Sequence, residues 1–267
     1  MQPFKNSPFA YGAGVARSEV QVDQGLRAFM LGVYNNMTVG LAISALVALG
    51  VNKLAIAASA AEAYRNAAGA PVRMGGQYLT QFGYTLYGTP LMWVVALAPL
   101  AFIFFFSFRL EKMSAATART TFLAFAAVMG ASLSTLLIRY TGASVVQVFF
   151  ITAASFGALS LWGYTTRRSL SGMGSFLIMG LFGLVIASIV NIFVASSALQ
   201  FGISIIGVLI FAGLTAYDTQ KLKEMYVYGN FDGEGAAKAS IFGALTIYLD
   251  FINMFQFLLA LVGNRNE

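Results

Sequence analysis

Long runs of apolar residues, separated by short polar stretches, make up most of this chain. A helix needs about 20 mainly apolar residues to cross about 30 Å of hydrocarbon. Six runs predict such helices, and they cover approximately residues 29–51, 90–108, 121–138, 145–164, 176–195 and 199–217. A seventh run, residues 241–262, is as long but contains Asp250, Asn253 and Gln256. We interpret it as a seventh span whose polar side faces the interior of the bundle.

Two segments do not follow the spanning pattern. Residues 1–27 are polar and contain no apolar run like the core of a signal peptide, so we expect a cytoplasmic tail ahead of a transmembrane domain at 28–267. Residues 52–89 carry arginines, glycines, tyrosines and Pro71, which predicts a long extracytoplasmic loop. The sequence shows no convincing internal repeat. It therefore predicts an all-α polytopic membrane protein, built as a single bundle of seven transmembrane helices.

The placement of lysine and arginine predicts the orientation, because these residues concentrate on the cytoplasmic side. With the N-terminus cytoplasmic, eleven basic residues fall inside and five outside. The inner ones are Lys5, Arg17, Arg27, Arg109, Lys112, Arg119, Arg167, Arg168, Lys221, Lys223 and Lys238, and the outer ones are Lys53, Arg65, Arg73, Arg139 and Arg265. Asp218 then lies at the inner end of the sixth span and Asp250 about ten residues into the seventh. Both fall in the cytoplasmic half.

The amino-acid composition excludes several classes of catalysis and binding. With 58% hydrophobic and 10% charged residues, the chain has more apolar surface than a soluble domain of 267 residues can bury. The absence of histidine and cysteine excludes Ser-His-Asp and Cys-His catalysis, thiol redox chemistry and the usual zinc and haem ligands. The net charge of +6 is spread over short loops, so we expect the lipid bilayer and not nucleic acid as partner. We predict no catalytic residues and no cofactor apart from transient calcium.

Asp218 and Asp250 are the exceptional acids of the chain, since the other eight of its ten acidic residues lie in predicted loops, tails or span ends. A carboxylate at the bilayer centre costs about 3 kcal/mol or more, which marks it as a candidate functional site. Two carboxyls that meet in a low dielectric do not both ionise easily and tend to share a proton. Such a pair is a proton-operated latch that, once deprotonated, offers oxygen ligands to a hard cation such as calcium. Two carboxylates alone predict a weak metal site.

Helical periodicity indicates how the two acids can meet, because residues three or four apart share a face. Asp250 shares a face with Gly243, Thr246, Asn253 and Phe257, and Asp218 shares one with Ser204, Phe211, Thr215 and Leu222. Small and polar residues on one side of a membrane helix favour close contact between helices. We expect the two faces to meet, with Tyr217, Thr215, Thr246 and Asn253 as supporting side chains around the pair.

Each aspartate also has a purely structural interpretation. Asp218 alternatively terminates the sixth span and is neutralised by Lys221 or Lys223 in headgroup water. Asp250 alternatively is satisfied by neighbouring hydroxyl and backbone groups. It lies far from any predicted helix end, so the structural interpretation fits Asp250 less well.

Around these acids the sequence resembles a known family. Ala216-Tyr-Asp-Thr-Gln-Lys-Leu-Lys223 and Leu245-Thr-Ile-Tyr-Leu-Asp-Phe-Ile-Asn253 are similar to the signature of the Bax inhibitor-1 family, also called the transmembrane Bax inhibitor motif family. The segments 128–134, 148–154 and 172–176 resemble its bacterial branch, and the resemblance extends roughly from Val20 to the end. It implies seven helices in a bacterial inner membrane and a pH-sensitive calcium leak, closed by an aspartate pair at Asp218 and Asp250. It also implies a basic partner near the inner end of the second helix, for which Arg109 and Lys112 are the candidates. The loop at 52–89 is longer than this family pattern.

Three other functions stay open at the level of sequence. Buried acids also serve as proton relays in proton-coupled transporters. A regulatory membrane protein, whose conductance is incidental, is the second. The third is an intramembrane aspartyl protease, which Tyr217-Asp218 fits, although Ile247-Tyr-Leu-Asp250 lacks the Gly-x-Gly-Asp pattern of such enzymes.

Overall fold

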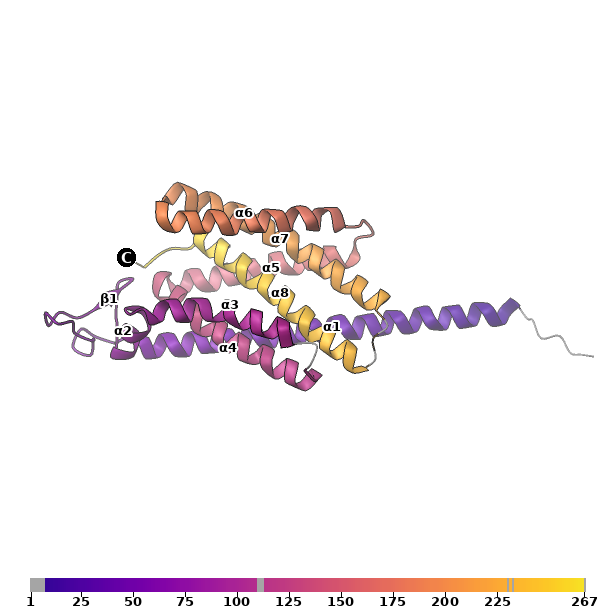
Figure 1. Ribbon diagram of the computed structural model, residues 1–267, viewed down its shortest axis with the longest axis horizontal. Helices are drawn as coiled ribbons and strands as arrows, with labels where there is room; N and C mark the ends of the chain where they lie inside the picture. Colours follow the sequence, from indigo (N-terminus) through magenta and orange to yellow (C-terminus); the bar gives the residue numbers. More distant parts are fainter. Residues whose placement is uncertain (1–7, 110–112, 230, 232, 267) are drawn as a thin grey trace, which may run out of the picture.

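The protein is a bundle of long helices with a small loop region at one end (Figure 1). The computed structural model describes residues 8–109, 113–229, 231 and 233–266. The helices are α1 (Pro8–Ala55), α2 (Gln81–Tyr87), α3 (Leu91–Arg109), α4 (Ala115–Arg139), α5 (Gly142–Thr165), α6 (Ser171–Val194), α7 (Ser197–Tyr228) and α8 (Gly233–Val262). Two short antiparallel strands, β1 (Arg73–Met74) and β2 (Gln77–Tyr78), complete the described elements. The all-α prediction is confirmed.

Six described helices are long and apolar enough to span a membrane, and the bent pair α2 and α3 adds a seventh candidate. The packing of α1 against α4 requires that seventh crossing. Ser44 of α1 bonds to Ala126 of α4, and about three turns further along both helices Ala55 packs in the same cluster as Ile138. The two helices therefore run in parallel. Because α4 starts at the end of the bundle where α1 starts, the chain between them has to return across it.

The loop between the first two spans is more ordered than the sequence predicted. β1 and β2 form a hairpin in which Arg73 pairs with Tyr78, and α2 begins with a Thr80 cap. Gly75, at φ +52°, sits so close to the Ile138 carbonyl that a side chain there would collide with it. The Tyr87 hydroxyl lies 2.6 Å from Ser134 Oγ of α4. These contacts fasten the loop to the end of α4, which we call the outer end of the bundle; the opposite end is the inner end.

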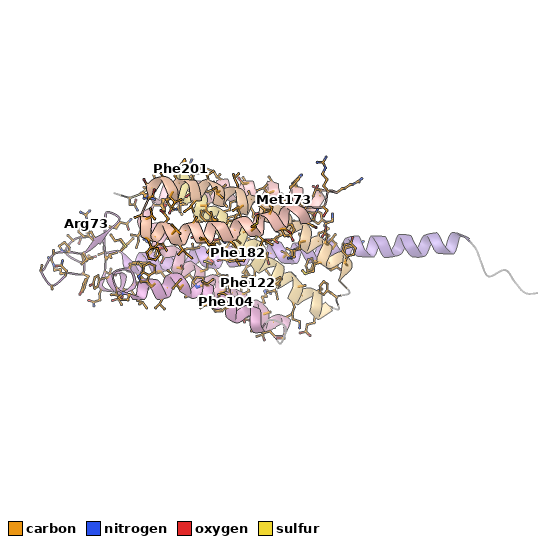
Figure 2. All side chains as sticks on the ribbon, turned by 45° about the horizontal axis from the view of Figure 1, so that its top comes forward. Arg73, Phe104, Phe122, Met173, Phe182 and Phe201 are labelled. Atoms are coloured by element: carbon orange, nitrogen blue, oxygen red, sulfur yellow. The ribbon has the colours of Figure 1, made fainter. Side chains whose placement is uncertain are left out.

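α8 lies at the centre of the bundle, where it contacts α1, α4, α5 and α7. Half of its most apolar stretch, 50%, is buried, against 11% for α6, which therefore presents most of its surface to lipid. Figure 2 shows Met173, at the start of α6, well separated along the long axis from Arg73 in the loop region. Asp250, in the middle of α8, is thus placed in the most enclosed part of the molecule.

Three helices extend beyond the spans that hydropathy predicted. α7 continues to Tyr228 instead of ending near Tyr217, α8 begins at Gly233 instead of Ile241, and α1 begins at Pro8, within the segment expected to be a tail. Of the side chains before residue 24 nothing is described. Asp218, predicted at the inner end of the sixth span, is followed by ten further helical residues of α7, so α7 does not end where the apolar run ends.

Candidate functional site: an aspartate pair between α7 and α8

Asp218 of α7 and Asp250 of α8 meet in the interior of the bundle. Their side chains are within hydrogen-bonding contact of each other. Because carboxylates only accept hydrogen bonds, that contact requires a proton on one of the two. Lys221, one turn after Asp218, lies close enough to attract its carboxylate.

The helix faces expected to meet are in contact near both ends of the α7–α8 interface. Near the outer end, the Phe257 ring of α8 fills the space over Gly207 and stacks on Phe211 at 5.9 Å. Near the inner end, Leu222 of α7 lies over Gly243 of α8. The pairings 207 with 257 and 222 with 243 are those of antiparallel neighbours, and they bring residue 250 to within about one helical turn of the position opposite residue 218. Two glycines thus set the close approach that brings the acids together.

Asp250 is the more enclosed member, with 4% of its surface exposed. Among the residues that the structure describes, no hydrogen-bond partner is found for its buried Oδ2 atom. The interpretation of Asp250 as a carboxyl fully satisfied by neighbouring hydroxyl and backbone groups is therefore wrong. A buried oxygen without a donor is costly, and such atoms in native proteins call for an explanation.

A chain of hydroxyl groups anchors α7 beside the pair. Thr219 donates to the Thr215 carbonyl at 2.7 Å, so its oxygen is left to accept from Ser160 of α5 at 2.9 Å. Ser160 in turn accepts from the Tyr34 hydroxyl of α1 at 2.6 Å. One residue after Asp218, α7 is therefore tied through α5 to α1. The backbones of α5 and α7 also touch, because a side chain at Gly163 would run into the Ala216 carbonyl.

A second hydroxyl contact anchors α8 on the other side of the pair. Tyr248, two residues before Asp250, is fully buried, and its hydroxyl lies 2.7 Å from Ser44 Oγ of α1. Ser44 donates to the Ala126 carbonyl of α4 at 2.7 Å. Both helices that carry an aspartate are thus connected to α1 by a tyrosine and a serine.

The four predicted supporting residues make no described hydrogen bond to the pair. Thr215, Thr246 and Asn253 each donate to a carbonyl four residues earlier in their own helix. Tyr217 packs against Gly174 of α6, with the Lys221 ammonium 5.9 Å from its ring centroid. The described contacts of these residues are thus within their own helices or, for Tyr217, also with α6.

The two candidates for the predicted basic partner, Arg109 and Lys112, lie at and just after the end of α3. Arg109 is the last residue of α3, but its side chain lies outside the described residues, as does all of Lys112. Lys223, the other cation considered for Asp218, donates to the Tyr164 carbonyl at 2.9 Å and thus reaches towards α5.

No group of three or more histidine, cysteine, aspartate or glutamate side chains able to hold a metal occurs within the described ranges. Any cation at the pair would have two carboxylates, with carbonyl and water oxygens completing its shell. A site with only two carboxylate ligands is expected to bind calcium weakly and transiently.

Tyr34, Ser160, Ser44 and Tyr248 were missed by the sequence reasoning. A single hydroxyl within an apolar run is common, and the partners lie up to 204 residues apart. A usable signal does exist on α5, where Thr152, Phe156 and Ser160 recur every four residues on one buried face.

A seven-span helical bundle with a protonatable pair between its last two helices defines an integral, multi-pass membrane protein with a carboxyl site in its interior. Residues 26–267 match the family model described as Inhibitor of apoptosis-promoting Bax1. The chain is 44% identical to an uncharacterized protein of Caulobacter vibrioides, over 98% of both chains. It is 41% identical to Inner membrane protein YbhL of Escherichia coli, over 93% of this chain and 96% of that one.

The chain belongs to the Bax inhibitor-1 family, and the resemblance in its sequence is confirmed. It is an integral, multi-pass protein of the inner membrane.

Proposed function

We propose that this protein is a pH-sensitive calcium leak channel, gated by a proton shared between Asp218 and Asp250. The observation that carries the proposal is the contact between these two carboxyls at the buried interface of α7 and α8. A protonated pair holds the two helices together by a hydrogen bond. Loss of the proton leaves two negative charges in a low dielectric, which repel each other and favour separation of the helices.

Calcium is the cation that the chemistry of the pair favours. Carboxylates are hard oxygen ligands, and the ionised pair exposes them only in the separated state. The unpartnered Oδ2 atom of Asp250 is an oxygen available for coordination. A site of two carboxylates binds weakly enough to release the ion, which permeation requires.

The hydroxyl contacts give the gate a fixed frame. Thr219 and Tyr248 flank the pair, and both are bonded through serines to the rest of the bundle. With the helices held at these points, a change in the protonation of the pair acts on the contact between α7 and α8. We infer that the movement on opening is concentrated at this contact.

Calcium flux from proteoliposomes tests the proposal. For the unchanged protein we expect flux to rise from mildly acidic to mildly alkaline pH, since the shared proton is lost in that direction. In Asp250→Asn the side chain at position 250 cannot ionise, but its amide can still donate a hydrogen bond to Asp218. Its ratio of alkaline to acidic flux should fall to about one, because the repulsion between like charges is gone. Asp218→Asn should behave in the same way.

Glu234→Gln is the matched control, because it removes an exposed acid from the first turn of the same helix as Asp250. It should keep the pH response of the unchanged protein. Wild-type flux and pH response in both aspartate variants would refute the latch.

The same preparations distinguish the other functions. Saturable solute uptake driven by a proton gradient, lost in both aspartate variants, would identify a proton-coupled transporter. Cleavage of a helical peptide with the same dependence would identify an intramembrane protease. A protein without flux, uptake or cleavage would fit a regulatory role.

A further inference from the structure

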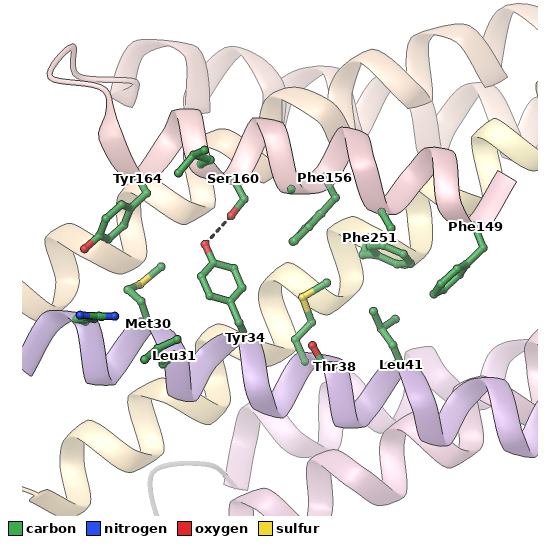
Figure 3. A pocket seen from close by; sticks show the side chains of 15 residues that line it. Met30, Leu31, Tyr34, Thr38, Leu41, Phe149, Phe156, Ser160, Tyr164 and Phe251 are labelled. Atoms are coloured by element: carbon green, nitrogen blue, oxygen red, sulfur yellow. Dashed lines mark hydrogen bonds between the residues drawn. The ribbon is translucent and has the colours of Figure 1, made fainter. Parts of the chain in front are cut away.

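A groove on the side of the bundle separates α1 from α5. Its volume is about 690 Å³, and Phe251 of α8 contributes to its lining. Figure 3 shows Tyr34 of α1 pointing towards Ser160 of α5, and Leu41 of α1 pointing towards Phe149 of α5 further along. We call it the α1–α5 groove. It is distinct from the aspartate pair, none of whose atoms line it.

Among the described residues that line the groove, Arg27 at one end is the only charged one. Arg27 lines it at the inner end, where α1 enters the bundle, and its side chain is exposed. Further along, the hydroxyl of Tyr34 is already bonded to Ser160 at 2.6 Å, so the ring is what Tyr34 offers to an occupant. Beyond Tyr34 the walls are mainly methionine, leucine and phenylalanine side chains, with Thr38 as a polar member. A cation followed by an apolar channel is complementary to an amphiphile with one anionic end.

The length of the groove matches one leaflet of a bilayer. Arg27 and Leu41 are 14 residues apart on α1. At about 1.5 Å per residue that distance is about 21 Å. A bilayer is about 40–45 Å thick with its headgroups, so one leaflet measures about 20–22 Å. A lipid whose phosphate meets Arg27 would therefore have its chain end near Leu41.

We propose that the α1–α5 groove binds one anionic phospholipid of the inner leaflet, with its phosphate at Arg27 and an acyl chain laid along α1 to Leu41. Contacts between membrane helices use small residues for close approach, whereas Leu31, Leu41 and Phe149 make these walls bulky and uneven. A flexible chain fits such walls better than a second helix does. The binding does not depend on the proposed calcium flux.

A second cavity extends the groove towards the outer end. It measures about 490 Å³ and shares Leu41, Phe149 and Phe251 with the first. This continuity gives the end of a long acyl chain space to enter.

A lipid in the α1–α5 groove would also contact a residue that is hydrogen-bonded towards the aspartate pair. Tyr34 forms part of the wall, and its hydroxyl begins the bonds through Ser160 to Thr219 beside Asp218. An acyl chain against the Tyr34 ring therefore packs on the anchor of α7.

Native mass spectrometry of the full chain, released from nanodiscs of equal parts phosphatidylglycerol and phosphatidylcholine, tests the proposal. The unchanged protein should retain one phosphatidylglycerol in preference to phosphatidylcholine. Gly157→Trp places a large side chain in the groove, where no described atom lies within 4 Å of the added Cβ. It should abolish this retention. Arg27→Gln should lower it about five-fold, the contribution of one basic residue near the surface.

Two matched variants control for side effects. Gly183→Trp adds the same ring to α6, where the added Cβ likewise has no described atom within 4 Å, and Arg167→Gln removes an exposed arginine outside the groove. Both should retain the lipid. Equal retention of the two lipids by the unchanged protein, or undiminished phosphatidylglycerol in Gly157→Trp, would overturn the proposal. A dimer that Gly157→Trp dissociates would assign the groove to a second copy instead. If Gly157→Trp does not fold, as judged by circular dichroism, Arg27→Gln against Arg167→Gln decides.

Discussion

Single hydroxyl groups connect the helices that carry the candidate site. Thr219 and Tyr248 lie one and two residues from an aspartate, and each is bonded to a serine on another helix. The hydrocarbon core contains no water that could hydrogen-bond a hydroxyl group, so the partners of these hydroxyls have to come from the protein. The positions of Asp218 and Asp250 therefore depend on residues that carry no charge themselves.

A double-mutant cycle on Tyr34→Phe and Ser160→Ala measures the first of these connections. Hydrogen bonds between membrane helices contribute about 0.6 kcal/mol on average and about 1.7 kcal/mol at most. We expect a stabilising coupling in that range from equilibrium unfolding in detergent. Tyr34→Phe combined with Ser188→Ala is the control, because Ser188 bonds to Leu184 within α6. A coupling no larger than in the control would mean that the 2.6 Å contact contributes nothing measurable.

Some residues of the site could be predicted from the sequence and others could not, for a physical reason. Asp218 and Asp250 are visible because charge is rare and costly in an apolar run. Tyr34 and Ser160 are ordinary in such a run, and only the packing of α1 against α5 and α7 gives them partners 126 and 59 residues away. Local sequence holds no information on those distances.

At the scale of helices, glycine sets which pairs come close. Gly163 brings α5 against the backbone of α7 at Ala216, and Gly207 and Gly243 admit large side chains between α7 and α8. Helix ends were the less predictable feature. The hydropathy pattern predicts only the part of a helix that lies within the hydrocarbon. The helix itself continues through residues such as Lys221, Leu222 and Lys223, which favour helix whether or not lipid surrounds them.

Gly163→Leu should separate α5 from α7. The added side chain meets the Ala216 backbone, which cannot rotate away, and such overpacking costs about 1–3 kcal/mol or more. We expect a lower midpoint of thermal unfolding in detergent, together with weakening of the bond between Ser160 and Thr219. Gly157→Ala on the same helix is the control, since its added Cβ contacts no described atom within 4 Å. An unchanged midpoint in Gly163→Leu would contradict the close crossing.

At the scale of the whole molecule, the parallel course of α1 and α4 decides the topology. Six helices are each long and apolar enough to cross a membrane. If only these six crossed, α2 and α3 would both lie on one side of the membrane. The bond between Ser44 and Ala126 and the shared packing of Ala55 and Ile138 oppose that arrangement. The bent pair has to carry the chain back from the outer end to the inner end.

Single cysteines in this naturally cysteine-free chain distinguish the two topologies. With seven crossings, Ser59 after α1 and Ser169 between α5 and α6 lie on opposite sides of the membrane, whereas with six they lie on the same side. Both side chains are exposed. In intact spheroplasts we expect a membrane-impermeant maleimide to label Ser59→Cys, and to label Ser169→Cys only after the membrane is opened. The unchanged chain is the control for background. Labelling of both cysteines from outside would remove the seventh crossing. It would also reverse α4 to α8 in the membrane, so that Asp218 and Asp250 would no longer lie in the cytoplasmic half.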